Sequence, residues 1–216
     1  KDRTVGIFYV TWHTQNLHNG KEYRADVSRV LAQDPYASRN NDSPAWTKSS
    51  YHWGEPEWGY FLSQDEYVIR KDMSMLTDAG VDMIIFDVTN AVLYWDEWAV
   101  TLRTMAQMKK EGNKVPKFCF WAFNGNVITV VHQLYDKYYK NPQYQDLWFY
   151  WDGKPLLLYN ATPSVDANVG GGEKNLADYS DEVKQFFTLR NMWWGYYEWA
   201  GNRYVGTEGN WSVGLQ

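Results

Sequence analysis

The sequence predicts an α/β fold of the (β/α)₈-barrel type, of which this chain carries about five βα units. Short apolar runs typical of buried strands alternate with amphipathic segments typical of helices, a pattern that produces parallel strands covered by helices. The second to fifth runs begin at residues 81, 116, 155 and 186, a spacing that matches the length of a βα unit. A complete barrel needs eight units and about 250 residues, so we expect the C-terminal units to be missing from these 216 residues. A five-stranded doubly wound parallel sheet is the alternative.

Each element follows from a local pattern, and together they form a single domain. Strands are predicted at residues 4–12, 81–88, 116–123, 155–159 and 186–196, and helices at 63–80, 96–111, 127–140 and 181–185. Ser63 and Glu66 form an S-x-x-E capping box that starts the first of these helices, and Gly80 ends it. Residues 147–159 are predicted to form a hairpin that turns at Asp152-Gly153. Residues 13–62 are predicted to be a long inserted loop at the active-site face.

Composition and charge argue against several classes of partner. The net charge of −5 and the pI near 5.4 disfavour binding to nucleic acid or to an anionic membrane, since both need basic patches. No run of about 18 apolar residues is present, so we expect no membrane span. The four His residues and the single Cys119 show no metal-ligand spacing, and we therefore expect no metal and no other cofactor. Cys119 lies in an apolar run and is predicted to be a buried small hydrophobe.

Aromatic residues are unusually abundant, at 18% with 13 Trp and 17 Tyr. An aromatic ring combines an apolar face with a polar edge, which suits the C–H face of a sugar as well as it suits a protein core. Ligands of parallel α/β folds bind at the carboxyl ends of the strands, where this sequence places rings, amides and His side chains. The predicted glycan-binding residues are Trp12, His13, His52, Trp53, Asn90, Trp121, Asn124, Tyr159, Asn160 and Trp193.

Two carboxyl groups are candidates for catalysis, because glycoside hydrolysis generally uses one as an acid and another as a nucleophile or base. Glu198 lies between Tyr197 and Trp199, and desolvation by such neighbours raises a carboxyl pKa, as a general acid requires. The structural alternative is that Glu198 pairs with Arg190 or Arg203. Asp87 ends a strongly apolar strand, so its ionised side chain must face a polar site or a partner.

Short motifs along the chain also resemble a known group of enzymes. They are the residues 6–9 (GIFY), 51–54 (YHWG), 59–65 (GYFLSQD), 79–82 (AGVD) and 153–159 (GKPLLLY). Their order is similar to glycoside hydrolase family 99, the endo-α-mannosidase-type barrels, and to the related barrels of family 71. The resemblance implies a barrel that acts on a glycan outside the cytoplasm, in the periplasm or after secretion.

The resemblance extends less clearly to the catalytic segment. Family 99 enzymes carry their glutamates in an N-E-W-x-E-G type motif, to which Glu198-Trp199 is similar. Tyr197 stands where the motif has Asn, and Gly201 stands where it has the second Glu. The resemblance therefore does not identify a second catalytic glutamate.

Three functions agree with these patterns. The first is a glycoside hydrolase that uses carboxylate acid/base chemistry on a polysaccharide or oligosaccharide. The second is a non-catalytic glycan-binding barrel, and the third is a polysaccharide lyase in which Tyr and His transfer the protons. A pair of carboxyl groups about 5 to 9.5 Å apart in one cleft would favour hydrolysis.

Overall fold

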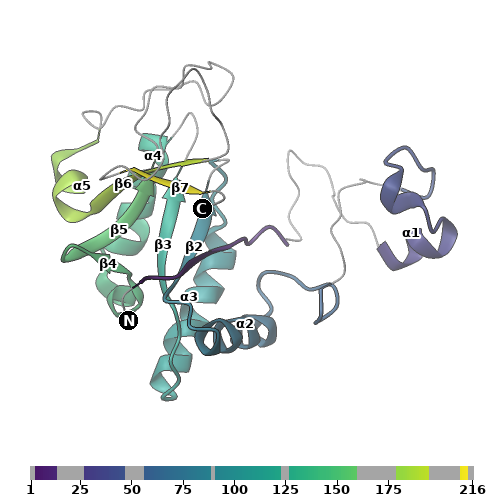
Figure 1. Cartoon of the computed structure of the whole chain (residues 1–216), viewed down its shortest axis with the longest axis horizontal. Coiled ribbons are helices and arrows are strands. Elements are labelled where there is room, and N and C mark those ends of the chain that lie inside the picture. Colours follow the sequence, from purple (N-terminus) through teal and green to yellow (C-terminus); the bar gives the residue numbers. More distant parts are fainter. Residues whose placement is uncertain are drawn as a thin grey trace.

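The computed structural model describes residues 3–13, 27–46, 56–88, 91–122, 127–159, 179–194 and 210–213, with 191–194 and 210–213 described as backbone. Within these described residues, the sheet has six parallel strands that follow one another in chain order (Figure 1). They are β1 (Gly6–Tyr9), β2 (Met83–Val88), β3 (Lys117–Ala122), β5 (Lys154–Tyr159), β6 (Thr188–Trp194) and β7 (Asn210–Val213). A doubly wound sheet reverses its strand order at a switch point. The unbroken order therefore excludes that alternative and matches an incomplete (β/α)₈ barrel.

All five predicted strands are present, and the sixth was not predicted. The strand β7 contains the short run Asn-Trp-Ser-Val, in which polar and apolar residues alternate. This run lacks the continuous apolar character of the strands buried on both faces, such as β2 with Met-Ile-Ile-Phe-Asp-Val. The first strand is also shorter than predicted, because it pairs with β2 only from Gly6 to Tyr9.

The predicted hairpin is confirmed, and it inserts between two strands of the sheet. The strand β4 (Tyr150–Trp151) runs antiparallel to β5, and the turn between them holds Asp152 and Gly153 at positive φ. The Phe149 N–H donates to the Phe118 carbonyl, and the Phe149 carbonyl accepts from Leu156. As a result, β3 and β5 pair directly only at their carboxyl ends, from Phe120 onward. The hairpin therefore holds the amino ends of these strands apart.

The helices follow the predicted order, with two differences. The first helix of the predicted set, α2 (Glu66–Asp78), begins two residues later than the capping box implied, because its N-cap is Asp65, whose carboxylate accepts from the Tyr67 and Val68 N–H groups. The predicted helix 127–140 is an α-helix, α4 (Val127–Leu134), that continues as a π-helical turn, η2 (Tyr135–Tyr139). The predicted helices at 96–111 and 181–185 are present as α3 (Trp95–Lys110) and α5 (Asp181–Phe186), and the 3₁₀ segment η3 (Pro142–Leu147) lies between η2 and the hairpin without having been predicted.

Part of the predicted loop 13–62 has structure of its own. It contains the helix α1 (Val27–Gln33) and the 3₁₀ turn η1 (Ala37–Arg39). Val30, Ala37 and Ala45 form a separate small cluster against Trp46. Residues 27–46 therefore pack on themselves.

Two apolar clusters cover the two faces of the sheet. The outer cluster joins alternate residues of the strands, such as Ile84, Phe86 and Phe120, to the helices. The inner cluster contains Met83, Ile85, Cys119, Trp121, Leu156 and Leu158. Cys119 is fully buried, as predicted, and burial raises its thiol pKa. The inner face is thus filled with side chains, as in the interior of a small barrel.

Candidate functional site

The carboxyl end of β2 brings one predicted catalytic residue to the inner face of the sheet. Side chains alternate along a strand, and Met83 and Ile85 belong to the inner cluster. Asp87 is two residues further on, so it lies on the same face, where it is half-buried. It pairs in register with Trp121 of β3. The structure therefore brings Asp87 and Trp121 together at the end where barrel ligands bind.

Trp121 does not have the open ring face that sugar stacking requires. Its side chain is fully buried, and its ring lies 5.0 Å from that of Phe8 at an interplanar angle of 42°. Leu158 pairs with it in register from the other side. The prediction of a stacking platform is not met at this position, because the ring fills the inner core beside Asp87.

Tyr159 also differs from the prediction. It pairs with Ala122 and belongs to the outer cluster, which is covered by helices, so only 6% of it is exposed. Its ring packs edge-on to Tyr179 at 5.5 Å, and burial raises the pKa of its hydroxyl. The alternation of side chains along β5 turns Tyr159 toward the helices. It is therefore a core residue in this structure.

His13 follows the end of β1 and is fixed through its backbone. Its N–H donates to the Ser63 hydroxyl at 3.1 Å, and its carbonyl accepts from the Ser63 N–H at 2.7 Å. The ring lies 4.8 Å from that of Phe61, and burial lowers the pKa of His13, which favours the neutral imidazole. Ser63 thus has a different role from the predicted helix cap. Trp12, beside His13, is half-buried.

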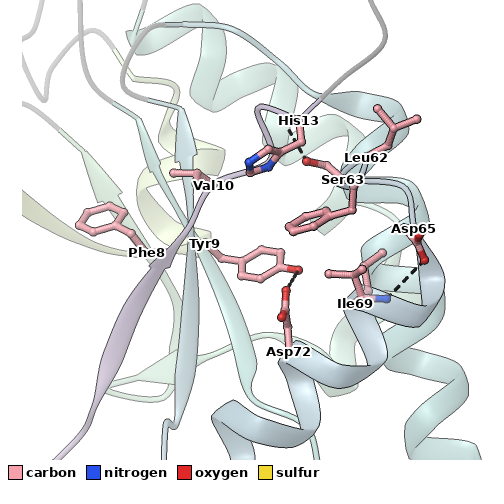
Figure 2. A pocket seen from close by; sticks show the side chains of 11 residues that line it. Phe8, Tyr9, Val10, His13, Leu62, Ser63, Asp65, Ile69 and Asp72 are labelled. Atoms are coloured by element: carbon pink, nitrogen blue, oxygen red, sulfur yellow. Dashed lines mark hydrogen bonds between the residues drawn. The ribbon is translucent and has the colours of Figure 1, made fainter. Parts of the chain in front are cut away.

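A cavity of about 200 Å³ lies between the end of β1 and the first turns of α2 (Figure 2). Besides His13 and Ser63, it is lined by Tyr9 and Asp72, and the Tyr9 hydroxyl donates to the Asp72 carboxylate at 2.9 Å. Burial raises the pKa of both groups, and the Asp72 charge raises that of Tyr9 further. This Tyr9–Asp72 pair was not predicted. The sequence gives one indication of it. Asp72 lies four residues after Val68, and therefore on the apolar face of the helix, where an acidic residue is unusual.

Other predicted site residues fall outside the described part of the chain. These are Glu198, His52, Trp53, Asn90, Asn124 and Asn160, and the side chain of Trp193 is also outside it. The guanidinium of Arg190, one of the two partners considered for Glu198, donates to Asp152 at 2.6 Å. Arg190 is thus held by the hairpin turn.

Searches for two other kinds of site gave negative results. Within the described ranges, no group of three or more His, Cys, Asp or Glu side chains could hold a metal ion. Among these same residues, every helix is too short or too polar to cross a membrane.

Comparison with known proteins gives one kind of match. No protein-family model and no curated protein matches the sequence. The chain is similar to solved structures of the GH99 endo-α-mannosidase from Bacteroides thetaiotaomicron. One, in complex with bis-tris-propane, is 19% identical with a TM-score of 0.49, and the match covers 88% of this chain and 52% of that one. Another structure of this enzyme is 19% identical with a TM-score of 0.48, over 87% and 55% of the two chains. This chain thus spans about half the length of these structures.

Proposed function

We propose that this protein is a glycoside hydrolase that acts on a polysaccharide or oligosaccharide, with Asp87 and Glu198 as its catalytic carboxyl groups. The observation that carries the proposal is the position of Asp87. It lies on the inner face of a barrel-type sheet, at the carboxyl end of its strand, where the ligands of such folds bind.

The chemistry of Asp87 supports a polar ligand at this end. Glycan hydroxyl groups are suitable partners, because a carboxylate accepts their hydrogen bonds. In the proposed mechanism Asp87 acts as nucleophile or base, and Glu198 protonates the leaving oxygen.

The sequence motifs and the structural likeness name the same enzyme family, which suggests the first substrates to test. We propose α-mannose-containing glycans as the first class, followed by other α-linked polysaccharides. The same resemblance supports a periplasmic or secreted location. The endo-α-mannosidase activity belongs to the proteins of those structures, and for this chain an activity of that class is part of the proposal.

The test is a panel of polysaccharides incubated with the purified protein, with release of new reducing ends as the readout. The informative variant is Asp87→Asn, which keeps the shape of the side chain and removes its charge. We expect turnover to fall by about 10²- to 10⁴-fold, the usual contribution of a positioned acid or base. The matched control is Asp152→Asn, which changes an exposed carboxylate in the hairpin at the amino end of β5. It is expected to leave turnover unchanged.

Two results would count against the proposal. Glycan binding without any product would indicate a non-catalytic binding protein. Equal turnover by the wild type and Asp87→Asn would remove Asp87 from the catalytic groups.

A further inference from the structure

The Tyr9–Asp72 cavity is separate from the Asp87 face. Tyr9 pairs in register with Phe86, whose side chain belongs to the outer cluster, whereas Asp87 follows Phe86 and turns inward. The cavity is therefore on the helix side of β1, and Figure 2 shows the Tyr9 ring directed at Asp72 of α2. Asp87 does not line this cavity, whereas His13, one of the predicted glycan-binding residues, does.

The charge of Asp72 is not balanced by the cations next to it on α2. Arg70 donates to both carboxylate oxygens of Glu111, at 2.7 and 3.1 Å. The Lys71 ammonium lies over the rings of Trp58 and Tyr67, 5.7 and 5.6 Å from their centroids. In the described part of the chain, the ion pairs recorded for these helices do not include Asp72.

A second carboxylate adds to the negative character of the cavity. Asp65 also lines it and caps α2 by accepting two backbone hydrogen bonds. None of the described residues that line the cavity is Lys or Arg, and burial keeps the pKa of His13 low. The Tyr9 hydroxyl, which donates to Asp72, is neutral. Among the residues that the structure describes, the cavity thus combines a half-buried carboxylate with a lining that contains no Lys or Arg.

Its walls are otherwise aromatic and apolar. The rings of Tyr9, Phe61 and His13 line it together with Val68 and Ile69. Aromatic faces attract cations, and a carboxylate forms charge-assisted hydrogen bonds with N–H donors. The volume of about 200 Å³ is below the roughly 300 to 1,000 Å³ of sites for drug-sized ligands. A cation on a short apolar stem fits these walls, whereas an oligosaccharide is too large.

We propose that this cavity binds a cationic amine, an ammonium or guanidinium group on a short apolar stem, with Asp72 as the charged partner and the Tyr9, Phe61 and His13 rings as walls. The group can come from a free small amine or from a Lys or Arg side chain of a protein segment that packs against β1. Both sources present the same chemistry to Asp72.

Calorimetric titration of the purified protein at pH 8 tests the proposal. The probes are n-butylammonium and benzylammonium, each compared with its neutral analogue, n-butanol or benzyl alcohol. We expect each amine to bind at least about tenfold more tightly than its alcohol, because it adds a charge-assisted hydrogen bond to Asp72. The blocked amino acids N-acetyl-lysine amide and N-acetyl-arginine amide form a further arm. Tighter binding of these than of the free amines would indicate a protein side chain as the source, and the reverse would indicate a small amine.

Two variants of α2 complete the experiment. Asp72→Asn keeps an oxygen that accepts from Tyr9 and removes the charge, so it is expected to lose the preference for amines. Asp78→Asn removes an exposed carboxylate at the end of the same helix, outside the cavity, and is expected to keep it. The proposal is overturned if the wild type binds no amine, if amine and alcohol bind equally, or if Asp72→Asn keeps the preference.

Discussion

Trp98 is expected to be among the most sensitive positions for stability, because it joins α3 to two central strands. Its side chain is fully buried, and its ring contacts those of Phe86 at 5.9 Å and Phe120 at 5.0 Å. Burying a Trp removes roughly 200 Å² from water, which at about 25 cal/mol per Å² corresponds to about 5 kcal/mol. Measured truncations of large aromatic residues cost about 3 to 5 kcal/mol. We therefore predict that Trp98→Ala lowers the free energy of unfolding by about 4 kcal/mol.

Urea unfolding followed by circular dichroism measures this loss. For a domain of this size, each kcal/mol shifts Tm by about 2 to 4 °C, so Tm should fall by about 8 to 16 °C. Tyr67→Ala is the control, because it removes an aromatic ring that is 58% exposed on α2, and it should change stability by less than about 1 kcal/mol. A loss below about 1 kcal/mol for Trp98→Ala, with an unchanged m-value, would refute the packing described for the outer cluster.

Two further predictions concern α2 and its surroundings. Asp65→Ala should destabilise the protein by about 1 kcal/mol, because it removes the cap of α2. Ser63→Ala should leave the helical circular dichroism signal unchanged. Equal loss of helix in both variants would contradict the assignment of Asp65 as the cap. Burial raises the pKa of Asp72 above 3.8, so the folded state holds this proton more tightly than the unfolded state, and stability is lost as pH rises through the raised pKa. Asp72→Asn should therefore gain Tm relative to the wild type at pH 7 and lose that gain near pH 4, and a constant difference across this range would show that the charge is not responsible.

The strands that the sequence predicts best are those buried on both faces. A largely apolar run such as Met83–Val88 predicts a strand buried on both faces. The Asp152-Gly153 pair predicts a tight hairpin turn, and both residues have the positive φ that this turn requires. Asn210–Val213 has no such run, and its assignment depends on pairing with β6, which is a tertiary interaction. The helix cap also depends on a tertiary interaction. Ser63 and Asp65 are both suitable N-cap residues, but the Ser63 hydroxyl accepts from the His13 N–H, and Asp65 caps α2.

The candidate site was predicted in part. The apolar run that contains Asp87 predicted the strand β2, and so placed Asp87 near the carboxyl end of the sheet, while its role in catalysis stays a prediction. The sequence could not distinguish an open Trp from a buried one, because the exposure of Trp121 depends on Phe8 of another strand. The Tyr9–Asp72 hydrogen bond joins residues 63 positions apart, so only the fold reveals it.

Glu198→Gln tests the proposed hydrolysis most directly, because the change keeps the shape and hydrogen bonding of the side chain and removes its transferable proton. Melting temperature and turnover on an active glycan are measured on the same preparation. A general acid predicts an unchanged Tm, retained glycan affinity and a fall in turnover of about 10²- to 10⁴-fold. Turnover close to that of the wild type, with or without a lower Tm, would contradict the assignment of Glu198 as the acid.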